Sequence, residues 1–240
     1  MKQSSPTKIE LDELLYLYQN QKFDEAERLA VSLSRRFPKH PFPWTVHGIV
    51  LQQTGRVIDS LASMQKSVQL APKDAGAHSN LGNTFKALGR LDKAEASYNQ
   101  AIALKRDFAE AHSNLGVTLQ EMGRFDEAEV SHTQAIALKP DYAEAYSNLG
   151  VTLHELGRLT QAEEKYLQAI ANEDPELHKE IKKYHLTFDD IIAKFPPDIL
   201  RGLLNAVELD QLSVAVKGVD QERIDELIEM LPQKKLPRKG

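Results

Sequence analysis

Residues 111–119 read AHSNLGVTL, and residues 145–153, which begin 34 positions later, read AYSNLGVTL. One period earlier, residues 77–85 read AHSNLGNTF. A second motif recurs in the same frame, as GRLDKAE at 89–95, GRFDEAE at 123–129 and GRLTQAE at 157–163. Self-similarity at a fixed period of this length indicates a repeat protein, in which each repeat buries its apolar face only by stacking on its neighbours.

The repeat frame extends over five units, at residues 7–40, 41–74, 75–108, 109–142 and 143–176. Each unit reads as two amphipathic helices joined by a turn, with Gly89, Gly123 and Gly157 at the turns of the last three units. The first unit has Glu13-Leu14 where Leu-Gly is expected, and we interpret it as a capping unit. The predicted fold is therefore all-α, a right-handed solenoid of five helix-turn-helix units.

The repeats resemble the tetratricopeptide repeat (TPR), whose pattern is a large residue, then Leu-Gly, an aromatic or aliphatic residue, a small Ala and a Pro at the unit end. The match is most specific in the last three units and covers residues 7–176. The resemblance implies that the first helix of each unit lines a concave groove. It implies that the following residues face a bound peptide: Asn80, Asn114, Asn148, Ser79, Ser113, Ser147, Glu110 and Glu144.

The three asparagines stand directly before each Leu-Gly pair. A carboxamide carries both donors and an acceptor, so a row of them can pair with the backbone of an extended peptide whatever its side chains are. The repeats are most similar to those of O-linked N-acetylglucosamine transferases, whose units carry such an asparagine ladder. The alternative is that Asn at this position follows the general TPR pattern without contacting a ligand.

Charge is unevenly distributed along the chain, whose net charge is -5. Residues 1–108 carry 15 basic and 11 acidic side chains, whereas residues 109–176 carry 4 and 13. We expect the acidic half to attract a basic or polar segment of a partner, although a solvated acidic face would look the same. The acidic balance disfavours a nucleic-acid partner.

The period ends after residue 176. Asp174 and Pro175 are a typical N-cap and first position of a helix, which predicts a capping helix or linker at 177–186. Residues 187–232 are predicted to form a small helical, armadillo-like module that resembles the C-terminal domain of the bacterial flagellar motor switch protein FliG. Four of the residues from Lys234 to Gly240 are Lys or Arg, so 233–240 form a basic tail.

The sequence favours no catalytic, metal or cofactor site. It contains no cysteine, no His-Glu-x-x-His motif and no phosphate-binding glycine loop. His78 and His112 occupy the large-residue position that Trp44 and Tyr146 hold in other repeats, which predicts a packing role. We therefore expect no enzyme activity and no cofactor.

The sequence-based hypothesis is a cytoplasmic scaffold or adaptor that binds a protein or peptide in the concave groove. The C-terminal helices would dock a FliG-like partner or another copy of the chain. Alternatives are the substrate-recognition part of a glycosyltransferase-like system, a flagellar-motor-associated protein and a self-assembling structural protein. No run of apolar residues reaches membrane-spanning length, so no membrane role is expected.

Overall fold

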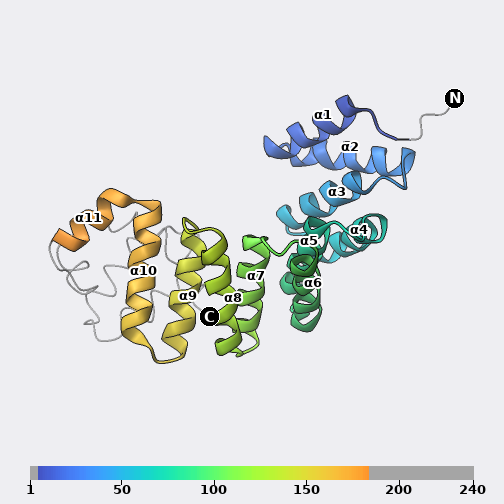
Figure 1. Ribbon diagram of the computed structural model, residues 1–240. Coiled ribbons are helices and arrows are strands. Elements are labelled where there is room, and N and C mark those ends of the chain that lie inside the picture. Colours follow the sequence, from blue (N-terminus) through green and yellow to red (C-terminus); the bar gives the residue numbers. More distant parts are fainter. Residues whose placement is uncertain (1–4, 184–240) are drawn as a thin grey trace, which may run out of the picture. The chain divides into compact units, whose positions relative to one another are not determined.

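The computed structural model describes residues 5–183, which contain α-helices and no β-strand. The helices are α1 (Lys8–Gln19), α2 (Phe23–Arg36), α3 (Pro41–Gln53), α4 (Val57–Leu70), α5 (Ala75–Ala87), α6 (Leu91–Leu104), α7 (Ala109–Glu121), α8 (Phe125–Leu138), α9 (Ala143–Glu155), α10 (Leu159–Glu173) and α11 (Pro175–Lys183). From α1 to α10 they follow one another as helix-turn-helix pairs (Figure 1). The all-α repeat fold predicted from the sequence is confirmed.

The chain divides into two compact units, with α1–α8 before Pro140 and α9–α11 after it. Helix α11 begins at Pro175, as the sequence predicted, and Asp174 Oδ1 accepts a hydrogen bond from the Leu177 backbone N–H at 3.0 Å. The predicted FliG-like module at 187–232 and the basic tail at 233–240 lie outside the described residues.

Side chains at two helix starts satisfy backbone N–H groups that have no partner within the helix. At α1, the Thr7 hydroxyl accepts from the Glu10 N–H at 3.2 Å, and the Glu10 carboxylate accepts from the Thr7 N–H at 2.8 Å. At α5, Asp74 Oδ1 accepts from the Gly76 N–H at 2.8 Å. These caps fix where the helices begin.

The turn inside each helix pair depends on one residue in the left-handed backbone conformation. Gly55, Gly89, Gly123 and Gly157 have φ values between 67° and 78°, and Gln21 takes the same place in the first repeat with φ 57°. The residue after each turn position donates back to the helix, as Arg90 N does to Phe85 O at 2.8 Å. This is the Schellman ending, which favours glycine.

A glycine on the first helix of a pair lies against a large side chain of the second helix in repeats two to five. A Cβ built on Gly82 would lie 2.7 Å from the Tyr98 ring, and one built on Gly116 would lie 2.5 Å from the His132 ring. The other two pairs are Gly48 with Met64 and Gly150 with Tyr166. No side chain larger than hydrogen fits at these glycines unless the ring or thioether moves.

The first repeat reverses this size pattern. Leu14 stands where the other repeats have glycine, and Ala30 stands where they have the large residue. Both side chains are fully buried in one apolar cluster with Ala26 and Leu33. In the first repeat the larger of the two side chains is therefore on the first helix, whereas in the other repeats it is on the second. The contact is filled in both cases.

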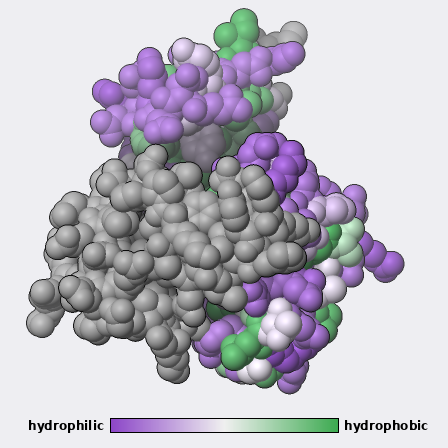
Figure 2. Space-filling view, turned by 90° about the vertical axis from the view of Figure 1, so that its left-hand side faces the viewer, coloured by the Kyte–Doolittle hydropathy of each residue, from purple (hydrophilic) through white to green (hydrophobic). Residues whose placement is uncertain are grey.

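Buried apolar residues form a series of clusters along the chain. One cluster draws on α1, α2 and α3, and another draws on α4 to α8. On the face drawn in Figure 2 the described side chains are mainly hydrophilic, with scattered apolar ones among them. Within the first compact unit, neighbouring repeats contact each other through α2 and α3, α4 and α5, and α6 and α7, as in a stacked array.

Replacing Gln21 with glycine is expected to stabilise the protein. The left-handed conformation costs a non-glycine residue about 1–2 kcal/mol, and the substitution removes this strain. Glycine is also more flexible in the unfolded chain, which reduces the gain in stability by ~0.5–1 kcal/mol. Urea unfolding followed by far-ultraviolet circular dichroism should therefore show a gain of about 0.5–1 kcal/mol. Gly123→Gln is the reciprocal control and should lose a similar amount, because a Cβ built there meets nothing within 4 Å. Equal stability of all three proteins would contradict the prediction.

Candidate functional site

Helices α5 and α7, the first helices of the third and fourth repeats, carry the predicted binding residues of the first compact unit, and the two helices contact each other. Asn80 and Asn114 are partly exposed, and Glu110 is exposed at the start of α7. Ser79 and Ser113 are 5% and 1% exposed, so their hydroxyls lie within the packing between helices. Of the predicted binding residues on α5 and α7, the two carboxamides and the Glu110 carboxylate therefore reach the surface.

The two asparagines differ in their hydrogen bonds. The Asn114 Nδ2 group donates to Asn83 Oδ1 at 3.2 Å, and the Tyr98 hydroxyl donates to the same oxygen at 2.6 Å. Within the described residues, the Asn80 carboxamide makes no hydrogen bond. Asn114 thus belongs to a polar chain that joins α7, α5 and α6, whereas Asn80 keeps its donors and its acceptor available.

A buried threonine supports the backbone behind each asparagine. The hydroxyls of Thr84, Thr118 and Thr152 donate to the backbone carbonyls of Asn80, Asn114 and Asn148 at 3.0, 2.8 and 3.0 Å. All three threonines are fully buried. A hydroxyl that bonds to the carbonyl four residues earlier needs no other partner inside the helix. The Asn-x-x-x-Thr spacing in each repeat is the sequence signal for this support.

In the second compact unit, α9 carries the corresponding residues. Ser147 and Asn148 are partly buried and Glu144 is exposed. Both Ser147 and Asn148 have interaction partners, so neither is a free polar group.

His78, His112 and Trp44 hold the loops between repeats. The ring nitrogen of each bonds to the backbone carbonyl six residues earlier, His78 to Pro72 at 3.0 Å, His112 to Arg106 at 3.2 Å and Trp44 to Pro38 at 3.3 Å. The packing role predicted for the two histidines therefore includes a hydrogen bond to the preceding loop.

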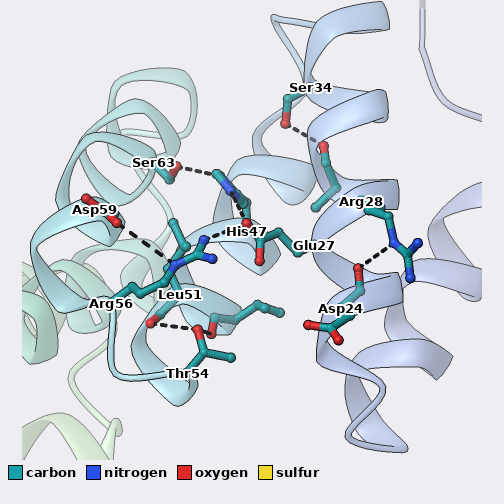
Figure 3. A network of polar contacts seen from close by, with 12 residues as sticks. Asp24, Glu27, Arg28, Ser34, His47, Leu51, Thr54, Arg56, Asp59 and Ser63 are labelled. Atoms are coloured by element: carbon teal, nitrogen blue, oxygen red, sulfur yellow. Dashed lines mark hydrogen bonds and ion pairs between the residues drawn. The ribbon is translucent and has the colours of Figure 1, made fainter.

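A polar network between the first two repeats was not predicted from the sequence. Glu27 on α2 accepts from Arg56 at 2.5 Å, and His47 Nε2 lies 3.9 Å from the same carboxylate oxygen (Figure 3). His47 Nδ1 also lies 2.8 Å from the Ser63 hydroxyl, and burial lowers the pKa of His47. His47 stands directly before Gly48, where the repeat pattern has leucine, and this departure is the signal that could have revealed it.

An equivalent ion pair links the third and fourth repeats. Arg124 Nη1 lies 2.7 Å from Glu95 Oε2, and Arg124 and Arg56 hold the same position in their repeats. Arg90 has no such partner in the second repeat. The position that Glu95 holds in the third repeat is Leu61 there, which offers no carboxylate. Such partly exposed pairs contribute about 0–1 kcal/mol each, so they add little to the stability of the fold.

His132 is a fully buried histidine, and its Nδ1 has no hydrogen-bond partner among residues 5–183. Its Nε2 lies 3.2 Å from Gln120 Oε1, and its ring packs against Gly116. Burial lowers the pKa of His132 to about 4, because the imidazolium ion would lose its hydration. The residue is therefore a neutral packing group at neutral pH.

Residues 5–183 contain no cluster of three or more His, Asp or Glu side chains that could hold a metal ion. Over the same residues, no helix combines the length and the apolar character needed to span a membrane.

Three family models match the chain. Two tetratricopeptide-repeat models match residues 82–123 and 107–172, and the FliG C-terminal domain model matches residues 168–236, so that match begins within α10. Residues 82–172 therefore match tetratricopeptide-repeat models, and the resemblance of the C-terminal segment to FliG is confirmed. No curated protein matches the sequence at a significant level.

Solved TPR structures share the fold. A crystal structure of MamA is 24% identical and covers 75% of this chain and 95% of its own, with a TM-score of 0.61. MamA from Desulfovibrio magneticus RS-1 is 18% identical and covers 70% and 96%, with a TM-score of 0.63. A thermophilic TPR protein in Thermus thermophilus is 23% identical and covers 74% and 97%, with a TM-score of 0.61. At these identities the likeness concerns the fold.

Acid is expected to destabilise the wild-type protein more than a His132→Tyr variant. Because the folded pKa of about 4 lies below the ordinary 6.5, the unfolded chain binds the proton first. The stability contributed by the neutral ring is therefore lost as the pH falls from about 7 towards 4, by about 2 kcal/mol at pH 5. Tyrosine is the matched replacement, since Tyr98 and Tyr166 fill the same position. Urea unfolding of both proteins at several pH values measures the difference, and parallel pH profiles would contradict it.

Proposed function

We propose that this array of tetratricopeptide repeats is a non-catalytic protein-interaction scaffold whose inner helices α5 and α7 bind an extended peptide. The observation that carries the proposal is the pair of partly exposed carboxamides, Asn80 and Asn114, on neighbouring inner helices. The repeat fold and the likeness to TPR structures support an interaction role.

The chemistry of the carboxamides suits a peptide backbone. Each peptide unit offers one N–H and one C=O, and a carboxamide can pair with both. Two such bonds contribute only about 1–3 kcal/mol, whereas a micromolar complex needs about 8 kcal/mol. Other contacts must therefore supply most of the affinity. Because Ser79 and Ser113 are buried, the proposal does not rely on them.

Acidic residues favour a basic or polar peptide. Glu110 and Glu121 are exposed at the two ends of α7. In the second compact unit, Asn148 corresponds to Asn114 and Glu144 corresponds to Glu110. We propose that they also contact a basic or polar peptide.

For the C-terminal segment we propose docking to a FliG-like protein or to another copy of the chain, which the family match over residues 168–236 supports. The similarity of the repeats to those of O-linked N-acetylglucosamine transferases stays a sequence-based prediction.

Replacing Asn80 and Asn114 with alanine is expected to weaken peptide binding about 10-fold, because two hydrogen bonds to the peptide backbone are lost. Peptides selected from a random display library by the full chain are the ligands, and fluorescence anisotropy measures their affinity. The matched control is Asn99→Ala with Gln100→Ala, since both side chains are exposed on α6. Unchanged affinity of the Asn80/Asn114 variant would remove the support for this site.

Binding of the selected peptides is also expected to weaken as the salt concentration rises from about 50 to about 500 mM. Salt screens the attraction between the acidic residues and a basic peptide, because the Debye length shortens. The same anisotropy titration measures the effect. A salt-independent affinity would show that charge does not steer the peptide.

A further inference from the structure

One position on the inner helices breaks the repeat pattern. Three residues after the asparagine that precedes Leu-Gly, repeats four and five have Val117 and Val151, whereas the third repeat has Asn83. The second repeat has Ile49 at the same place. A polar residue at a position that is apolar in three other repeats needs a physical reason, and its hydrogen bonds provide one.

Asn83 lies between a core tyrosine and a predicted ligand-binding residue. Its Oδ1 accepts from the Tyr98 hydroxyl at 2.6 Å and from Asn114 Nδ2 at 3.2 Å. The Tyr98 side chain is 0% exposed and packs against Gly82, so its hydroxyl is held in place by the core.

The bond from the Tyr98 hydroxyl sets the orientation of both carboxamides in the structure. The hydroxyl donates to Asn83 Oδ1, so the oxygen end of Asn83 faces it. That oxygen then attracts the nitrogen end of Asn114. Burial and the nearby Glu121 carboxylate raise the pKa of Tyr98, so the hydroxyl stays protonated and remains a donor.

We propose that Asn83 is a positioning residue, which fixes the Asn114 carboxamide so that its oxygen is left to accept a backbone N–H of the bound peptide. Within the described residues, Asn114 Oδ1 has no hydrogen-bond partner. The Asn80 carboxamide has no such anchor and can turn either end to the ligand. The proposal rests on the proposed peptide-binding function and adds to it a requirement: the peptide residue at Asn114 must carry an N–H, which excludes proline and N-methylated residues there.

The first test needs no ligand. In proton–nitrogen correlation spectra of the full chain, the Asn114 side-chain amide protons should be well separated in shift and slow to exchange with solvent. Two variants should both collapse this separation. Asn83→Val introduces the residue found in repeats four and five, and Tyr98→Phe removes only the hydroxyl. Asn83→Asp keeps an acceptor oxygen and should preserve it.

Tyr166→Phe is the matched control, because Tyr166 packs against Gly150 in a repeat that has Val151 in place of Asn83. It should leave the Asn114 signals unchanged. Asn114 signals that are the same in wild type, Asn83→Val and Tyr98→Phe would overturn the positioning role, whether or not any peptide binds.

The second test uses the selected peptides. Asn83→Val should weaken binding about 5-fold, the effect of one misaligned hydrogen bond, and Asn83→Asp should restore most of it. N-methylation at one peptide residue should weaken binding to wild type about 5-fold and should have a smaller effect on binding to Asn83→Val. If Asn114→Ala weakens binding but Asn83→Val does not, the positioning role fails while the proposed function stands. If neither Asn80→Ala nor Asn114→Ala has an effect, the proposed function fails, and the amide signals still decide the positioning role.

Discussion

The packing of a large side chain onto a bare backbone is the contact on which the helix pairs of repeats two to five depend. Gly82 and Gly116 have no side chain, so the rings of Tyr98 and His132 lie directly on the helix backbone. The distance between the two helices of a repeat is therefore set by the thickness of this side chain, a ring in repeats three to five and the Met64 thioether in repeat two. The first repeat meets the same constraint with Leu14 and Ala30 in exchanged roles. A size change on one helix must be matched on the other, since a packed core tolerates neither a void nor an overlap.

This contact also connects the interior to the surface. The Tyr98 ring fills the space beside Gly82, while its hydroxyl reaches Asn83 and, through it, Asn114. In the fourth repeat the same position holds His132, whose Nε2 lies 3.2 Å from Gln120 Oε1 and whose neutral form is favoured by burial. The residue at this position thus determines which polar side chain of the first helix the core reaches, Asn83 in the third repeat and Gln120 in the fourth.

The strictly periodic features could be predicted from the sequence. The turn glycines, the helix pairs, the packing role of His78 and the start of α11 at Pro175 all follow from residues that recur in one frame or from local capping rules. The link from Asn83 to Asn114 and the His47 network could not be predicted in the same way. Both join side chains on different repeats. Asn83 and His47 depart from the repeat pattern, but the sequence does not show which side chains they contact in the folded protein. The peptide-binding role of the asparagines remains a proposal, because their recurrence before Leu-Gly is also expected from the general TPR pattern.

The turns inside the helix pairs have a practical consequence. A Cβ built on Gly55, Gly89, Gly123 or Gly157 would have nothing within 4 Å, so no packing contact depends on the space beyond these turns. The helix endings are closed by backbone bonds, such as Arg124 N to Leu119 O at 2.9 Å, and beside Gly55 the Thr54 hydroxyl also donates to Val50 O at 2.9 Å. A side chain introduced at one of these glycines would therefore cost only the strain of the left-handed conformation and would leave the packing between the helices unchanged.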